Sequence, residues 1–177
     1  MSETPDFPAP VAEEGDSTRR AAQSARDYAF RRARRLERQL GRGGHGSVYS
    51  TTEQTAIKAH RAVESYTREL ACYKRLNEQN VDEVRGHHVP QLVAWDEALL
   101  VIDMTIVTPP LRLDFGGAYL DWPPEFSEDA IAEWQREKRE QFGERWPAVQ
   151  GILAILADEY GIFVTDVNPG NIMFDDA

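Results

Sequence analysis

LGRGGHGSV, Leu40–Val48, is the stretch from which the rest of the sequence is best interpreted. It has the form G-x-G-x-x-G-x-V, with Gly41, Gly43 and Gly46 followed by Val48. Glycines let a backbone approach phosphate oxygens and present N–H groups to them. Because a strand pattern follows rather than a helix, the dinucleotide-binding version of this motif is disfavoured. The stretch therefore predicts either a phosphate-binding hairpin or a plain turn, and its neighbours must decide.

The neighbouring residues predict an antiparallel sheet with one helix. LERQL, SVYS and TAIK are short alternating runs separated by glycines or polar residues, as in adjacent strands. VESYTRELACYKRL follows as a helix with Glu69, Cys72 and Leu76 on one face. PQLVAW and ALLVIDMTIV add two strands, and 77–88 is predicted to be a polar loop in which His87 and His88 are not metal ligands. Residues 36–107 thus form three strands, a helix and two strands, an α+β arrangement.

After residue 107 the predicted structure is mostly helical. Ser127 can cap a helix that runs to about Gln141, and Gly143 ends it. Pro147 suits the first turn of a second helix, which Gly161 ends.

The N-terminal region divides into an acidic and a basic part. Residues 1–18 hold three prolines and five acids and are predicted to be a disordered tail. Residues 19–35, rich in Ala and Arg, are predicted to be a basic helix. Eight arginines between Arg19 and Arg38 face only two acids, although the whole chain has a net charge of −10. The segment could bind an acidic partner, but a helix lying against the protein's own acidic surface is the favoured interpretation.

Bulk properties exclude several classes of function. The net charge of −10 argues against general affinity for nucleic acid. No apolar run approaches a membrane span, and MSETPDFPAP lacks the apolar core of a secretory signal, so a cytoplasmic protein with no membrane partner is expected. The single cysteine, Cys72, excludes an internal disulfide framework and a zinc cluster of thiolates.

Four polar residues are candidates for chemistry. TAIK puts Lys58 in the strand after the hairpin, from which an ammonium can reach phosphates under the glycines. Glu69 can pair with Lys58, whereas Glu64, the competing acid, lies off the inner stripe of the helix. In DVNPGN, Asp166 is a candidate base and Asn171 a candidate Mg²⁺ ligand. The simpler alternative for this last motif is a turn that ends a helical region.

These motifs, in this order, resemble the protein-kinase-like superfamily from about Leu36 to Phe174. The resemblance implies a two-lobe fold, with 36–107 as the N-lobe and hinge and 108–177 as a shortened, mostly helical C-lobe. It implies binding of ATP and Mg²⁺, with an adenine slot lined by Met104 to Val107. It also implies transfer of the γ-phosphate to a hydroxyl, with Asp166 and Lys58 as catalytic residues. D-x-x-P-G-N is as similar to aminoglycoside and choline phosphotransferases, so the acceptor stays open, with Ser or Thr of a protein preferred.

The sequence departs from the family in two places. Val164-Thr165 replaces the His-Arg that normally precedes the catalytic aspartate. No D-F-G segment, whose aspartate binds Mg²⁺, follows Asn171. LDFGG, with Asp114-Phe115-Gly116, lies before the catalytic loop, so its use would require a permuted chain path. The simpler interpretation is that Phe115 packs under the hinge.

These departures leave alternative functions open. Asp175 and Asp176 are further candidates to reach the metal. A catalytically impaired nucleotide-binding module is one alternative, and a partner protein that completes the shortened lobe is another. A third is an interaction protein with a basic arm, in which the motifs are accidental.

Overall fold

The computed structural model describes residues 12–107 and 112–174. The helices are α1 (Ala12–Arg31), α2 (Val63–Glu78), α3 (Glu128–Phe142), a 3₁₀ turn η1 (Gly143–Arg145) and α4 (Trp146–Tyr160). The longer strands are β1 (Leu36–Arg42), β2 (Gly46–Thr51), β3 (Thr55–His60), β6 (Leu92–Asp96) and β7 (Val101–Thr105). The short strands are β4 (Glu83–Val84), β5 (His87–His88), β8 (Arg112–Leu113), β9 (Ala118–Leu120), β10 (Ile162–Val164) and β11 (Ile172–Met173).

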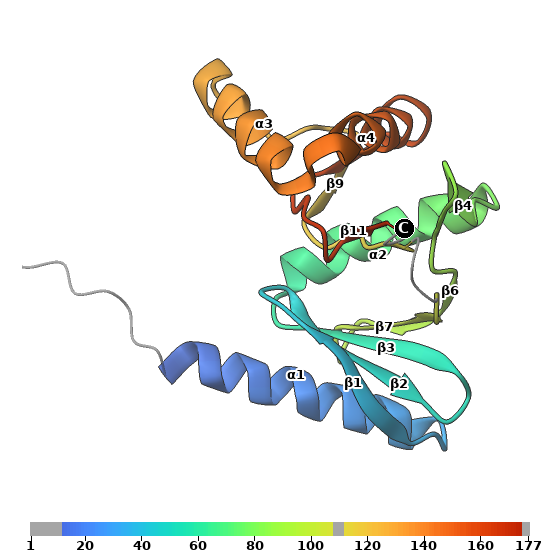
Figure 1. The fold of residues 1–177 in the computed structure, drawn as a ribbon. Coiled ribbons are helices and arrows are strands. Elements are labelled where there is room, and N and C mark those ends of the chain that lie inside the picture. The colour runs from blue at the N-terminus through green and yellow to red at the C-terminus, as the bar shows by residue number, and fades with distance from the viewer. Residues whose placement is uncertain (1–11, 108–111, 175–177) are drawn as a thin grey trace, which may run out of the picture.

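The predicted five-stranded antiparallel sheet is confirmed, with the order β1-β2-β3-β7-β6 (Figure 1). Strand β3 is central, and five of its six residues are buried. Lys58 on this strand lies opposite Val48 of β2 and Ile102 of β7. A charged side chain in the middle of a buried strand requires compensating partners, which the site below supplies.

Helix α1 packs against one face of this sheet, opposite the face that α2 approaches (Figure 1). Its small residues Ala21, Ala25 and Ala29, with Tyr28, form a buried cluster with Ile57, Ala59 and Val101 of the sheet. Two corrections follow: residues 12–18 belong to α1 and not to a disordered tail, and the helix ends at Arg31. Residues 1–11 lie outside the described part.

Basic residues at and just after the end of α1 pair with acids of the same chain. Arg34 contacts the fully buried Asp103 at 2.5 Å and Glu53 at 2.6 Å, and Arg31 contacts Asp96 at 3.3 Å. The favoured interpretation, a basic segment against the protein's own acidic residues, is therefore supported for these arginines.

Helix α2 lies across the other side of the sheet and buries the predicted stripe. Tyr66, Glu69, Leu70, Cys72, Tyr73 and Leu76 are all buried. Five of these six, all except Glu69, are members of the main apolar core that also receives Phe142, Trp146 and Leu156 of the 128–160 region. The helix thus connects the sheet to the second half of the molecule and fixes Glu69 on its inner face.

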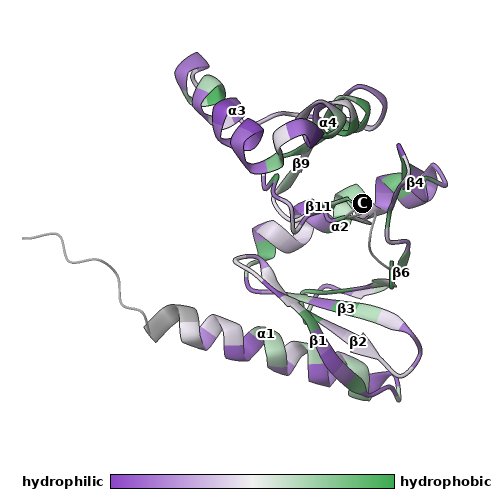
Figure 2. Ribbon diagram, viewed as in Figure 1, coloured by the Kyte–Doolittle hydropathy of each residue, from purple (hydrophilic) through white to green (hydrophobic). Residues whose placement is uncertain are grey.

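The second half contains the two predicted helices together with short strands. Ser127 accepts a hydrogen bond from the Ala130 backbone N–H at 3.2 Å, and Gly161 ends α4 with φ of 63°. Both caps agree with the sequence pattern. Helix α4 is the more apolar of the two, and its buried residues face the core (Figure 2).

Four short strand pairings accompany the helices of the predicted mostly helical region and correct the prediction of a polar loop at 77–88. Strand β10 pairs with β9, and β11 pairs with β8. Strand β5, inside the predicted loop, pairs with both β4 and β8, and His87 on it is buried. These pairings bring the 112–120 segment beside the 162–173 segment.

Among the helices of residues 12–107 and 112–174, none combines the length and apolar composition needed to cross a membrane.

Candidate functional site

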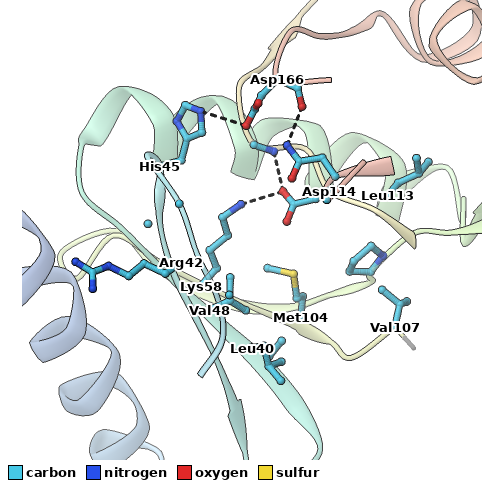
Figure 3. Close-up of a pocket in the computed structure, with 18 of the residues that line it drawn as sticks. Leu40, Arg42, His45, Val48, Lys58, Met104, Val107, Leu113, Asp114 and Asp166 are labelled. Carbon is cyan, nitrogen blue, oxygen red and sulfur yellow. Dashed lines mark hydrogen bonds and ion pairs between the residues drawn. The ribbon is translucent and has the colours of Figure 1, made fainter. Parts of the chain in front are cut away.

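A cavity of about 380 Å³ lies between the five-stranded sheet and the loops of the second half (Figure 3). It is lined by all the residues predicted from sequence except Glu69, namely Gly41, Gly43, Gly46, Val48, Lys58, Met104, Val107, Asp166 and Asn171. Glu69 lies behind Lys58 and contacts it. The size is within the range of small-ligand pockets.

The glycine hairpin forms one wall and contains two kinds of glycine. A Cβ atom built on Gly41, Gly43 or Gly44 would meet no atom within 4 Å, so these backbones are open to the cavity. A Cβ on Gly46 would lie 2.3 Å from the Ala59 carbonyl oxygen. Gly46 is therefore required for close packing of β2 on β3, whereas the other three leave space for a ligand.

The opposite end of the cavity is apolar. Leu40, Met104 and Val107 lie there, and Val48 lies between them and Lys58 (Figure 3). Residues Ile106 and Val107, which follow β7, also line this edge. Such a surface can hold a flat apolar ring while the charged end binds a polar group.

Lys58 sits at the charged end with two carboxylate partners. Its Nζ donates to Glu69 Oε1 at 2.6 Å and to Asp114 Oδ1 at 3.0 Å. The predicted pair with Glu69 is thus confirmed, and the competing Glu64 is exposed on α2. Burial lowers the pKa of the Lys58 ammonium, but the charges of Asp114 and Glu69 outweigh it and hold this pKa above its usual value. Lys58 is therefore cationic.

Asp114 is the site residue that the favoured sequence interpretation missed. Strand β8 pairs with β11, and the Asp114 backbone N–H donates to the Asn171 carbonyl at 3.0 Å. Its carboxylate also accepts from the Gly116 N–H at 2.8 Å. The LDFGG motif was the available signal, but the spatial link to Asn171 depends on a pairing between distant short strands.

The simpler interpretation placed Phe115 under the hinge, and in the structure its ring packs against α2. It is fully buried and meets the Tyr73 ring of α2 edge to face, with centroids 5.4 Å apart. Asp114 on one side of Phe115 enters the cavity, while Phe115 itself fixes the segment to the helix that carries Glu69.

The 114–118 segment is also fastened to the loop that carries Asp166. Thr165 Oγ1 donates to the Gly117 carbonyl at 2.6 Å. Gly117 has φ of +72°, and a Cβ there would lie 3.0 Å from Asp166 Cβ. Only glycine allows this close approach without strain.

The DVNPGN loop is held by its own asparagines. Asn168 Nδ2 donates to Asp166 Oδ1 at 2.9 Å. The Oδ1 of Asn168 accepts from the Gly170 and Asn171 backbone N–H groups. Asn171 Nδ2 donates to the Asp166 carbonyl at 2.7 Å. That bond uses the amide nitrogen and leaves the Asn171 side-chain oxygen for a cation. The Asp166 carboxylate is 44% exposed, so a substrate group can reach it.

His45 closes the cavity from the hairpin tip. Its Nε2 lies 4.0 Å from Asp166 Oδ2, the oxygen that Asn168 does not bind (Figure 3). Lys58 and Asp166 thus face the same cavity, one from the sheet and one from the second half.

A preformed cluster of metal ligands is not found in the described part of the chain, where no three His, Cys, Asp or Glu side chains gather to hold a metal. Asp114 and Asn171 both line the cavity and are joined by the backbone hydrogen bond described above. Asp175 and Asp176 lie outside the described residues.

Glu69 has a second buried partner, His60, that the sequence pattern did not indicate. His60 Nε2 lies 2.9 Å from Glu69 Oε2, so each oxygen of this carboxylate has its own nitrogen partner. His60 follows Lys58 by two positions, which places both side chains on the same face of β3.

Comparison of the chain with protein-family models, with curated proteins and with solved structures gives no match.

Proposed function

We propose that the cavity binds ATP with Mg²⁺ and transfers the γ-phosphoryl group to a hydroxyl, in a kinase-like cleft. The observation that carries this proposal is the contact of Lys58 with both Glu69 and Asp114 in a cavity that Asp166 and Asn171 line from the other side. An ion-paired lysine, two aspartates and an asparagine are the polar groups that kinases use on the phosphates and metal.

The donor set fits the proposed ligands. The open backbones of Gly41, Gly43 and Gly44 suit phosphate oxygens, and the apolar end near Met104 suits an adenine ring. Mg²⁺ is usually bound by one or two carboxylates together with substrate phosphates and water, so Asp114 and Asn171 suffice without a third protein ligand. Bound Mg²⁺ would neutralise charge on the phosphates.

The order of motifs along the chain differs from that of the family. Here the Asp-Phe-Gly triplet comes before the catalytic loop, yet Asp114 contacts Lys58 and is hydrogen-bonded to Asn171 through the backbone. We infer a permuted arrangement in which Asp114 is the metal-binding aspartate. This removes the reason for proposing an impaired module, namely that no such aspartate follows Asn171.

Each residue then has a role in the reaction. Lys58 binds phosphate oxygens, and Glu69 holds its ammonium in place. Asp166 accepts the hydroxyl proton as the acceptor oxygen forms its bond to the γ-phosphorus. The bond from that phosphorus to the bridging oxygen breaks, and ADP leaves with the electron pair. Catalysis of this kind depends mainly on positioning and charge stabilisation.

The acceptor is proposed to be a hydroxyl on a protein Ser or Thr, with a small molecule as the other class. The exposure of Asp166 is compatible with either. A partner protein over the second half and a cytoplasmic location also remain proposals.

Thermal-shift titration with ATP, with and without Mg²⁺, tests the proposal. We expect stabilisation that increases with Mg²⁺. Lys58→Met should weaken ATP binding by about tenfold or more, because it removes a charge-assisted contact worth about 1.5–3 kcal/mol. Asp166→Asn should keep ATP binding and abolish phosphoryl transfer to hydroxyl acceptors. Stabilisation by ATP that does not depend on Mg²⁺ would instead favour a nucleotide-binding module. No stabilisation by ATP would refute both the phosphotransferase and the nucleotide-binding module.

A further inference from the structure

His60 is a buried histidine whose two ring nitrogens both face oxygen acceptors. Nε2 lies 2.9 Å from Glu69 Oε2, and Nδ1 lies 3.2 Å from the Leu100 carbonyl oxygen. The side chain is fully buried, so water does not replace either partner. The Leu100 carbonyl can only accept, and it already accepts from the His60 backbone N–H at 2.9 Å.

The neutral imidazole ring cannot donate at both contacts. Opposite an ionised Glu69 carboxylate, its single N–H leaves one nitrogen with a bare lone pair facing an oxygen and no proton between them. Only the doubly protonated ring donates at both positions. A bare lone pair held against an acceptor in a buried site is unfavourable because nothing solvates it.

The charges around the ring are consistent with the protonated form. Glu69 lies between His60 and Lys58 and uses one oxygen for each. Lys58 in turn contacts Asp114, so with a protonated His60 ring two cations would alternate with two anions in one chain of contacts. A single carboxylate between two cations, itself buried, has its charge compensated on both sides.

Two neighbours of His60 outside its own strand, Tyr66 and Gly46, carry no charge. On α2, the Tyr66 ring lies edge to face with His60, with centroids 5.6 Å apart. Burial raises the pKa of Tyr66 to about 12, so its hydroxyl is neutral. On β2, the residue opposite His60 is Gly46. Glu69 is thus the carboxylate that the His60 ring contacts.

We propose that His60 is a positioning residue, held as an imidazolium, which fixes the Glu69 carboxylate so that its other oxygen holds Lys58. The ring prevents rotation of the carboxylate by binding the oxygen that Lys58 does not use. The protonation of the ring stands on the hydrogen-bond geometry alone. Its consequence for ATP rests on the proposed function.

The first test measures ring protonation in the full chain by long-range ¹H–¹⁵N NMR near pH 7.5, where an ordinary histidine is mostly neutral. We expect one ring with both nitrogens protonated, whose signals disappear in His60→Gln. Glu69→Gln should convert that ring to a neutral tautomer, because its counter-charge is lost. Lys58→Met should leave it doubly protonated. A neutral His60 ring in the wild type, or a neutral ring in Lys58→Met, would overturn the proposal.

The second test separates positioning from simple packing. His60→Gln keeps a donor for Glu69 without charge, whereas His60→Phe keeps only a ring. We expect His60→Phe to weaken ATP-dependent stabilisation by about tenfold in apparent affinity, the effect of one charge-assisted hydrogen bond. His60→Gln should recover most of that loss. Equal ATP affinity in His60→Phe and wild type would refute the positioning role. Absence of ATP binding in the wild type would defeat the proposed function while leaving the NMR result intact.

Discussion

Asp114→Asn is the substitution that most sharply tests the proposed metal-binding role of Asp114, which precedes the DVNPGN loop in the chain. The amide has the shape of the carboxylate and can still accept from the Gly116 N–H. Lys58 loses one of its two anionic partners but keeps Glu69 at 2.6 Å. The variant therefore removes one charge from the cavity without emptying any space, and its effect on Mg²⁺ can be separated from an effect on folding.

The magnitude follows from the loss of one charged ligand. A contact with a charged group contributes about 1.5 kcal/mol at the low end, which is about tenfold in affinity. At saturating ATP this removes about 1.4 kcal/mol of ligand-induced stabilisation. For a domain of this size we expect the ATP–Mg²⁺ shift in Tm to be smaller by about 3–6 °C.

The sign of the metal effect gives the clearest outcome. Without Mg²⁺, the Asp114 carboxylate repels the phosphates, so Asp114→Asn should bind metal-free ATP as well as the wild type or better. With Mg²⁺, the wild type should gain affinity and the variant should not. Asp158→Asn, which removes the same charge from an exposed position on α4, is the control and should behave as the wild type. An unchanged Mg²⁺ dependence in Asp114→Asn would refute the role of Asp114.

Three further predictions concern the fold around the site. Gly46→Ala should lower the free energy of unfolding in urea by about 2 kcal/mol, because the added Cβ meets the Ala59 carbonyl. Gly43→Ala, in open space, is the control and should change this free energy little. Equal effects of the two substitutions would contradict the packing argument. Arg34→Met should lower the free energy of unfolding by about 3 kcal/mol in the same measurement, since it leaves the buried Asp103 without its cation. A loss below about 1 kcal/mol would argue against a stabilising Arg34–Asp103 pair. Burial lowers the pKa of His87 below the ordinary 6.5, so the unfolded chain takes up a proton that the folded chain does not as pH falls through that value. Stability should therefore fall as pH decreases from about 7 to 5.5, and His87→Phe should reduce this slope; the same slope in both proteins would exclude His87 as its source.

The sequence predicted the sheet and the Lys58–Glu69 contact because these depend on local periodicity. Alternation of apolar and polar residues indicates the strands, and the i, i+3, i+4, i+7 stripe identifies Glu69 as the acid on the buried face of α2. Helix caps at Ser127 and Gly161 were equally readable, since each depends on one residue and its own backbone. The boundaries of elements were less predictable. Helix α1 begins before the basic segment, and its start was missed because its first turns carry polar residues that also suit a disordered tail.

The Asp114 contact and the His60 contact depend on residues far apart in the chain. Strands β8 and β11 have two residues each, too short for any periodic signal. Chain order alone argued against the use of Asp114, since the catalytic loop follows it. His60 gave no motif, because one histidine at a strand end has many ordinary roles and its partner lies on another element.

The permuted order is physically reasonable because strand pairing, not chain order, fixes the Asp114 segment. Before the Asp114-Phe115-Gly116 triplet, β8 pairs with β11, and after it, β9 pairs with β10. Strands β9 and β10 are antiparallel with Leu120 opposite Ile162, so the chain leaves this pair and returns to it at neighbouring points. Helices α3 and α4 fill the excursion between them. An excursion of this kind does not disturb the strands at its base. The same two pairings therefore hold Asp114 beside Asn171 and Gly117 beside Asp166, whichever of the segments the ribosome makes first.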